Sequence, residues 1–210
     1  MYVAVCLKLL SQKEKSQTSS QNIKSPNHQL KPQRTRILDV FQAIKSRRSI
    51  RAFTRDDVSE REVERLVEAA RWAPSAGNIQ PWEFVIVTNA ETKRRLSVAA
   101  LDQTFIQEAP IVIVVCADEA RSALRYGGRG TNLYCLQDTA AATQNILLTA
   151  HALGLGACWI GAFREDAVKA VLEPPRNLRP VAIVPIGHPA EKPSAPPKRS
   201  ISDFMHYETF

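Results

Sequence analysis

The chain has 210 residues, of which 44% are hydrophobic, and a formal net charge of +7. This length and composition predict one soluble globular domain with a sizeable core. The charge suggests a nucleic-acid ligand, but residues 1–36 carry seven Lys or Arg and one Glu, a net of +6, which leaves +1 for residues 37–210. Because the folded part is nearly neutral, we expect no nucleic-acid partner for it.

Residues 1–36 are predicted to be a poorly ordered basic arm that precedes a folded domain at 37–210. The arm is rich in Ser, Gln and Lys and has no hydrophobic periodicity. Its apolar opening, MYVAVCLKLL, is shorter than the about 20 residues that cross a bilayer and lacks a convincing cleavage site. We expect a solvated tail and no membrane partner. An arm that binds a partner or a surface is the alternative.

The cysteines and histidines show no metal-ligand spacing. No two cysteines form a CxxC or CxxxC pair, and the four histidines lie far apart. We therefore expect no metal site. Cys116 and Cys158 lie inside apolar runs, which predicts reduced core residues and a cytoplasmic protein.

The first elements of the folded part are two helices and a strand. Apolar residues at helical spacing predict a helix over 38–46. Ser59 and Glu62 form a capping box, which predicts the start of a helix that reaches about Trp72. The run EFVIVT predicts a strand over 83–88.

The middle of the chain contains the two most regular elements. A helix over 90–100 is followed by the β-branched run IVIVVCA at 111–117, which is typical of a strand covered on both faces. The stretch 134–153 is rich in Ala and Leu and lacks Gly and Pro, so we predict that it forms the longest helix, in a central place. Gly154 and Gly156 are predicted to end this helix.

The C-terminal third is shorter in its elements. It predicts a short strand or turn at 157–161, a helix over 164–172 and a last strand over 179–187. A Pro-rich, extended tail follows at 188–204. The reading is α/β or α+β, with at least three strands and four or five helices.

The segment RRSIRAF gathers Arg47, Arg48, Ser49 and Arg51. Guanidinium groups are planar, bidentate and permanently charged, so two of them with a hydroxyl suit a phosphate dianion. A solvated basic turn is the alternative reading of such a run.

The segment PSAGNIQPW, residues 74–82, combines small residues with free amides. Asn78 and Gln80 each carry a donor and an acceptor, which suits the polar edge of a planar heterocycle; an ordinary helix-to-strand loop is the alternative. The glycines of GLGACWIG, residues 154–161, follow a helix and lack the spacing of a dinucleotide fingerprint. Asp138, on an Ala-rich helix, is interpreted as a satisfied buried polar group.

No serine, cysteine or paired-carboxylate arrangement has the context of a catalytic site. Clusters that suit a phosphate and a heterocycle, without a catalytic acid, suggest that a cofactor does the chemistry. Six segments, in this order, resemble the FMN-dependent nitroreductase family, and the resemblance covers about 37–210. These segments are RRSIRAF, APSAGNIQPWEFVIV, EAPIVIVVCAD, DTAAATQNILLTAHALGLGACWIGAF, VAIVPIGHP and PPKRSISDF.

The resemblance implies an α+β fold with a central, mainly antiparallel sheet between helices. It also implies an interlocked homodimer with the long helix in the interface. The C-terminal segment would be exchanged, so that it extends the partner's sheet. FMN would lie at the interface, with its phosphate held by Arg47, Arg48 and Ser49 and by Lys198 or Arg199 from the tail.

The same resemblance places Arg51 near flavin N1 and O2, where a cation stabilises the anionic reduced flavin. Asp102 or Gln103 would meet the ribityl chain or the pyrimidine edge. Ile160 would pack on the ring, and the Gly161 amide would point towards N5. The other subunit would contribute residues of one loop, namely Pro74, Ser75, Ala76 and Asn78.

We therefore expect an oxidoreductase that transfers a hydride from NADH or NADPH, through FMN, to a small electron-poor acceptor such as a nitroaromatic or a quinone, by a ping-pong mechanism. Alternatives on the same scaffold are reductive dehalogenation, flavin-degrading synthesis of a cobalamin ligand, or flavin binding without catalysis. The chain departs from the family at Ala76, where several members carry Ser. It also has only a short glycine-rich segment at 118–130, where larger relatives insert covering helices.

Overall fold

In the computed structural model, which describes residues 39–210, strand β2 (Ile111–Asp118) is buried at every residue except the last. Strands β1 (Trp82–Val87) and β4 (Leu178–Gly187) flank it, and the two-residue β3 (Gly156–Ala157) lies beyond β4. All three strand pairs are antiparallel. The predictions made for residues 1–36 lie outside the described residues.

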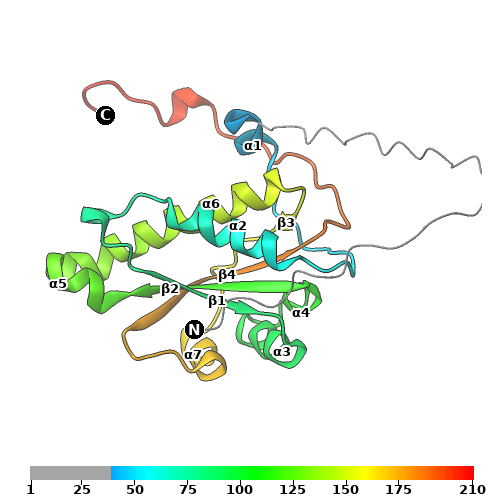
Figure 1. Cartoon of the computed structure of the whole chain (residues 1–210). Coiled ribbons are helices and arrows are strands. Elements are labelled where there is room, and N and C mark those ends of the chain that lie inside the picture. The colour runs from blue at the N-terminus through cyan, green and yellow to red at the C-terminus, as the bar shows by residue number, and fades with distance from the viewer. Residues whose placement is uncertain (1–38) are drawn as a thin grey trace, which may run out of the picture. The chain divides into compact units, whose positions relative to one another are not determined.

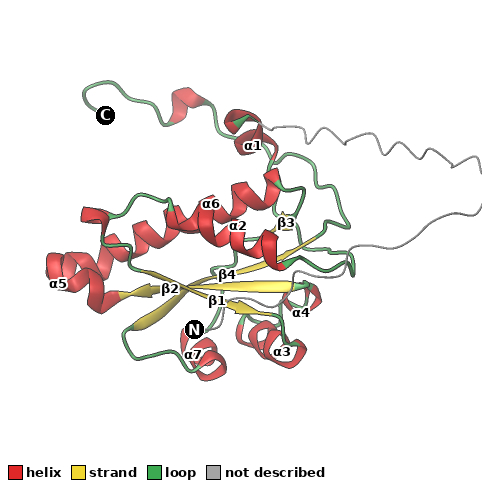
Figure 2. Ribbon diagram, in the orientation of Figure 1, coloured by secondary structure: helices red, strands yellow, loops and turns green. Residues whose placement is uncertain are grey.

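Helices cover both faces of this sheet, as Figures 1 and 2 show. Alternate residues of β2 enter two separate cores, as strand geometry requires: Ile113 packs with residues of α2 and α6, whereas Val114 packs with residues of α3, α4 and α7. The bounds of the α-helices are α1 Val40–Ser46, α2 Glu60–Arg71, α3 Ala90–Ala99, α4 Phe105–Glu108, α5 Glu119–Arg129, α6 Cys135–Ala152 and α7 Glu165–Leu172. The α+β class with an antiparallel sheet between helices is confirmed.

Helix α2 begins as its sequence predicts. The Ser59 side chain accepts a hydrogen bond from Glu62 N, and the Glu62 carboxylate accepts one from Ser59 N at 2.8 Å. Leu66 and Ala70 are fully buried and carry the apolar face of the helix. The cap therefore sets the start of the helix, and the apolar stripe seats it on the sheet.

Helix α6 is the longest helix among residues 39–210, as predicted, and Gly154 with φ +80 follows its end. The prediction that Gly156 also ends the helix is wrong, because Gly156 is the first residue of β3. A Cβ at Gly156 would lie 2.7 Å from Ile50 Cγ2, so glycine is required there by close packing. Past Ala157 the backbone continues to an isolated bridge between Ile160 and Ile183.

The expected number of helices was too low, because the described residues contain seven α-helices. The segment after β2 is one cause: it forms α5, which kinks at Gly127, and then the π-helix Gly130–Tyr134, which runs into α6. Short 3-10 turns lie at Ala76–Asn78 and Ile201–Asp203. Gly127 thus lies at the kink, and Gly130 at the start of the π-helix, in a region that is otherwise continuously helical.

Within residues 39–210, Cys116, Cys135 and Cys158 are buried and unpaired, in keeping with the prediction of reduced core residues at Cys116 and Cys158. Burial raises the pKa of Cys116 to about 11. Within residues 39–210 no helix is long and apolar enough to cross a membrane. No group of three or more His, Cys, Asp or Glu in this part of the chain could hold a metal ion.

The start of the C-terminal tail pairs with the stretch that follows α1. Thr54 N donates to His188 O at 2.9 Å, and Ala190 N donates to Ala52 O at 2.9 Å. Phe53 and Pro189 form the bridge between these bonds. This pairing carries the tail from the end of β4 to the residues that form the candidate site.

Candidate functional site

The basic segment, Arg47–Arg51, begins where α1 ends and is held along the edge of the sheet. Ile50 N donates to Ala157 O at 3.0 Å, and Ser49 forms a parallel bridge with Ala157. Ile50 is buried, whereas Arg51 is exposed. The backbone is therefore fixed by β3, while the Arg51 side chain is left exposed.

Arg48 has two surroundings at once. Its Nη1 donates to Lys45 O and Arg47 O, both at 2.8 Å, and so satisfies carbonyls at the end of α1. Its Nε is buried and has no hydrogen-bond partner within the described part of the chain. A buried donor without an acceptor costs about 1–3 kcal/mol, so this atom indicates a place for a bound acceptor.

The basic segment and the tail together form the cationic cavity, which has a volume of about 570 Å³. Five cations line it and, among the described residues, no carboxylate does. The polar and charged lining residues are Lys45, Arg47, Arg48, Ser49, Arg51, Ser194 and Lys198. Of the two tail cations predicted for a phosphate, Lys198 lies in this cavity. Arg199 instead donates to Asp203 O at 2.6 Å.

The residues predicted near the ring and the ribityl chain lie in two segments, one around Gln103 and one around Gly161, and Gln103 bonds to the second of these. The Arg51 guanidinium stacks over the Phe105 ring at 5.9 Å. Gln103 donates its amide protons to Ala100 O at 2.8 Å and Ala162 O at 3.1 Å. The amide of Gln103 thus holds the loop after Gly161 in place, while Asp102 is exposed in a left-handed conformation with φ 60.

Ile160 and Gly161 follow β3 and differ in exposure. Ile160 is buried and exchanges two backbone hydrogen bonds with Ile183, at 2.9 and 3.0 Å. Gly161 is exposed, with open space where a Cβ would stand. Nearby, burial raises the pKa of the Cys158 thiol, against smaller opposing effects of Arg51 and a Ser49 hydrogen bond. A protonated thiol is a poor nucleophile, so the structure assigns Cys158 to packing.

The loop Ser75–Gln80 does not line the cationic cavity. Its Ala76 N donates to both carboxylate oxygens of Asp138, at 3.1 and 3.2 Å, which confirms that Asp138 is a satisfied buried polar group. Asn78 lines a different cavity of about 350 Å³ beside Trp72. In one chain, therefore, the predicted residues Pro74, Ser75, Ala76 and Asn78 do not join the basic segment.

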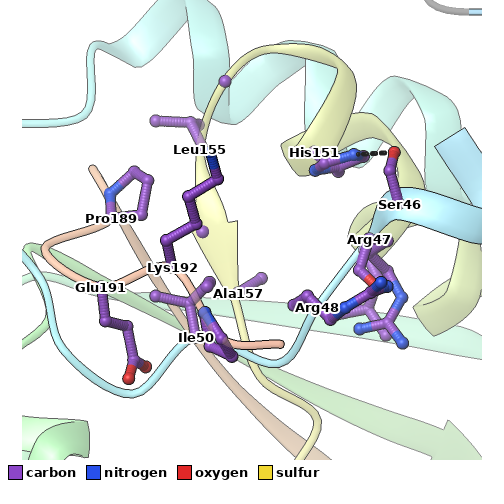
Figure 3. A pocket seen from close by; sticks show the side chains of 14 residues that line it. Ser46, Arg47, Arg48, Ile50, His151, Leu155, Ala157, Pro189, Glu191 and Lys192 are labelled. Atoms are coloured by element: carbon purple, nitrogen blue, oxygen red, sulfur yellow. Dashed lines mark hydrogen bonds between the residues drawn. The ribbon is translucent and has the colours of Figure 1, made fainter. Parts of the chain in front are cut away.

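A second cavity, of about 420 Å³, lies on another side of the basic segment and shares Arg47 and Arg48 with the first (Figure 3). At its rim Ser46 Oγ lies 2.7 Å from His151 Nε2 and donates to Gln42 O at 2.5 Å. The single hydroxyl proton of Ser46 is used in the bond to Gln42 O. The hydrogen bond between Ser46 and His151 therefore uses a proton on His151 Nε2, which donates to Ser46 Oγ. Burial lowers the pKa of His151, and the nearby Arg47 and Arg48 lower it further.

Sequence reasoning missed several residues that hold these segments. Arg121 Nε donates to Ile79 O at 2.7 Å, and Arg125 Nη1 donates to Gly77 O at 3.3 Å, so α5 holds the loop by its carbonyls. Glu191 binds the basic segment from the tail. These partners lie 42 to 140 residues apart in sequence, and no local pattern marks them.

Comparison with known proteins finds relatives that match most of this chain. An FMN reductase (NADPH) from Bacillus subtilis is 30% identical over 185 residues, which is 82% of this chain and 74% of that protein. A protein from Archaeoglobus fulgidus, provisionally described as NADH dehydrogenase/NAD(P)H nitroreductase, is 37% identical over 158 residues, 73% of this chain and 87% of that protein.

A solved structure of similar fold and the sequence profile of a protein family also match this chain. The NADPH:FMN oxidoreductase from Vibrio harveyi, solved in complex with NAD⁺, superposes with a TM-score of 0.75 at 26% identity. That match covers 81% of this chain and 77% of the other. The profile of the Nitroreductase family matches residues 44–108 and 98–188, a span that includes the basic segment, the loop Ser75–Gln80 and the whole sheet. The chain therefore belongs to the nitroreductase family.

Proposed function

We propose that this protein is an FMN-dependent oxidoreductase. It would take a hydride from NADH or NADPH and pass it to a small electron-poor acceptor in a ping-pong cycle. The cationic cavity carries this proposal, because five cations, with no carboxylate among the described lining residues, meet where the family resemblance places the FMN phosphate. The names of the relatives, which include an NADPH-dependent FMN reductase, support the same cofactor and electron donor.

The residues present fit a phosphate. The buried Arg48 Nε has no acceptor within residues 39–210, and a phosphate oxygen would supply one. Arg47 and Lys198 reach the cavity from two segments far apart in sequence, and Ser49 adds a hydroxyl. Charge-assisted hydrogen bonds from arginine are about twice as strong as neutral ones, so this set suits a dianion.

When bound, FMN supplies the hydride chemistry at its isoalloxazine ring. The protein's part is to position it and to provide charge. Arg51 would lie where negative charge develops on reduction, and its stacking on Phe105 keeps that guanidinium in place. Cys158 would take no part, because its thiol stays protonated at neutral pH.

We propose further that the active form is a homodimer with exchanged tails. The loop Ser75–Gln80 lies apart from the cationic cavity, so a second chain is needed to bring both to one flavin. The α1 helix leaves Phe41 70% exposed, and the tail leaves Phe204 56% exposed. Such apolar residues, clustered on a short helix and an extended tail, favour burial against a partner.

The test is to purify the full chain, identify its flavin by mass spectrometry, and mix it anaerobically with NADH or NADPH in a stopped-flow instrument. We expect about one FMN per chain, reduction by at least one nicotinamide, and reoxidation by a nitroaromatic or a quinone. FAD, or no flavin after reconstitution with FMN, would contradict the cofactor. Turnover of only a halogenated phenol, or loss of the bound flavin itself, would favour one of the alternative reactions.

A further inference from the structure

Glu191 connects the tail to the basic segment by its side chain. Its Oε1 accepts hydrogen bonds from two consecutive backbone amides, Arg51 N at 2.5 Å and Ala52 N at 3.1 Å. Hydrogen bonds to an ionised acceptor are the strong ones, and two adjacent donors also fix the direction of the backbone. The carboxylate therefore sets the position from which the Arg51 side chain leaves the main chain.

The place of Glu191 in the chain gives this contact a second consequence. The backbone pairing between tail and basic segment ends with Ala190 N donating to Ala52 O, and Glu191 is the next residue. Beyond it the tail turns along the cationic cavity, which it lines from Pro193 to Lys198. The same carboxylate thus ends the paired region and begins the cavity wall.

Glu191 also brings a negative charge close to the cations. It lines the second cavity together with Arg47, Arg48 and Lys192 (Figure 3), and it is the only carboxylate among the lining residues described for that cavity. The Glu191 Oε1 accepts from the backbone amide of Arg51, whose guanidinium is the cation that the proposed function places by the flavin. The negative charge of Glu191 therefore lies next to the residue that carries this cation. It offsets part of the positive potential there.

We propose that Glu191 is a positioning residue that fixes the backbone of Arg51. Through this contact the position of the C-terminal tail would affect the position of the Arg51 charge in the flavin site. The anchoring of Arg51 stands on the contacts alone. The coupling to the flavin rests on the proposed function, so the two parts are tested by separate measurements.

The anchor is tested by hydrogen exchange of the peptide that contains residues 50–53, in the full chain as purified. In Glu191→Ala the two amides lose their acceptor, and we expect exchange about tenfold or more faster than in the wild type. In Glu191→Gln the side-chain oxygen still accepts, so exchange should stay within about twofold of the wild type. Unchanged exchange in Glu191→Ala would overturn the anchor.

The coupling is tested with FMN. Glu191→Ala should bind FMN roughly tenfold more weakly, because the tail that lines the cationic cavity and the backbone of Arg51 both lose the bonds that hold them. Glu191→Gln should retain FMN but raise its midpoint potential, since one negative charge near the reduced, anionic flavin is gone. Glu64→Gln is the matched control, because it removes an exposed carboxylate of α2 and should leave both quantities unchanged.

The outcomes separate the two claims. Fast exchange in Glu191→Ala with unchanged FMN affinity, or an unchanged potential in Glu191→Gln, would overturn the coupling. A wild-type chain that binds no FMN would overturn the proposed function and the coupling with it, while the exchange measurement would still decide the anchor. If Glu191→Ala does not fold, the potential of Glu191→Gln decides the coupling by itself.

Discussion

The basic segment and the loop Ser75–Gln80 are the two regions whose sequences indicate ligand binding, and the fold treats them in opposite ways. The basic segment is held by its backbone, through Ala157 and Glu191, so the side chains of Arg47 and Arg51 stay available. The loop is held by charged side chains from α5 and α6 that occupy its amides and carbonyls. One region offers charge to a ligand, whereas the other offers shape and two amide side chains.

The loop also stores more backbone strain than the basic segment does. Gly77, Asn78 and Gln80 all have positive φ, at 56°, 56° and 54°. Such residues cost about 1–3 kcal/mol each when they are not glycine and persist only where neighbours hold them. The bonds from Asp138, Arg121 and Arg125 are therefore the reason that the loop keeps its form without a ligand.

The largest expected effect comes from removing the charge of Arg51 in the basic segment. Arg51→Ala should slow reduction of bound FMN by roughly a hundredfold, about 3 kcal/mol, because one preorganised donor to the developing charge is lost. FMN affinity should fall much less, since Arg47, Ser49 and Lys198 remain. Arg47→Ala is the contrast, with weaker binding and near-normal reduction. Single-turnover reduction and FMN titration of both variants measure this, and wild-type reduction in Arg51→Ala would place Arg51 away from the ring.

The next effect breaks the support of the loop. Asp138 is only 7% exposed, and Asp138→Ala leaves Ala76 N without its acceptor, at a cost of about 1–3 kcal/mol in the free energy of unfolding. Asp138→Asn keeps an acceptor oxygen and should cost less. Urea unfolding of the two variants makes the measurement, and equal losses would show that the hydrogen bond is not what holds the loop.

The free energy of unfolding of the wild type and of Asp138→Asn should depend differently on pH, because the Asp138 carboxyl is buried. Burial raises the pKa of Asp138 above its ordinary value, and the Ala76 bond only partly opposes this. A raised folded pKa means stability that is present at low pH and is lost as the pH rises through the folded pKa. Wild type should therefore lose stability relative to Asp138→Asn on going from acid to neutral pH.

A smaller effect sharpens the strain argument. Gly77→Ala puts a Cβ on a residue with φ +56, and that Cβ would lie 2.6 Å from the Tyr126 hydroxyl. It would also lie 2.7 Å from Arg125 Nη1, which donates to Gly77 O, so the cost of the left-handed backbone, about 1–2 kcal/mol, adds to the displacement of that hydrogen bond. Thermal unfolding tests it, with Gly161→Ala as control, because nothing lies within 4 Å of a Cβ there. An equal loss in both variants would contradict the argument.

The smallest expected effect lies beside the basic segment. Burial, Arg47 and Arg48 lower the pKa of His151 below 6.5, so its contribution is fully present above that pH and is lost as the pH falls through the lower, folded value. In His151→Gln an amide can still donate to Ser46, and this acid loss should vanish. The loss of stability between about pH 7.5 and about pH 5.5 should be small in the wild type and absent in the variant. A parallel pH dependence in the variant would show that His151 is not the group that titrates.

The elements that could be predicted from sequence are those decided by local pattern. The β-branched run of β2 and the Gly- and Pro-free stretch of α6 need no knowledge of the fold, and the Ser59–Glu62 box acts within one helical turn. Helix α5 was not predicted, because its two adjacent glycines, Gly127 and Gly128, resemble a loop. An Asp118 N-cap starts the helix, and contacts of Arg121 and Arg125 with the loop Ser75–Gln80 hold it.

By itself, the sequence determined the helices and strands of strong pattern and the charge of the basic segment, because hydrophobic period and charge type are properties of neighbouring residues, and the resemblance of six of its segments indicated the family. Tertiary structure alone decided that Lys198 and not Arg199 enters the cationic cavity, that Asp138 supports a loop 62 residues away, and that Glu191 binds an amide 140 residues away. The physical reason is that a hydrogen bond depends on a few ångströms of position. Which distant groups come that close is set by how the helices and the tail pack on the sheet, and no local pattern encodes it.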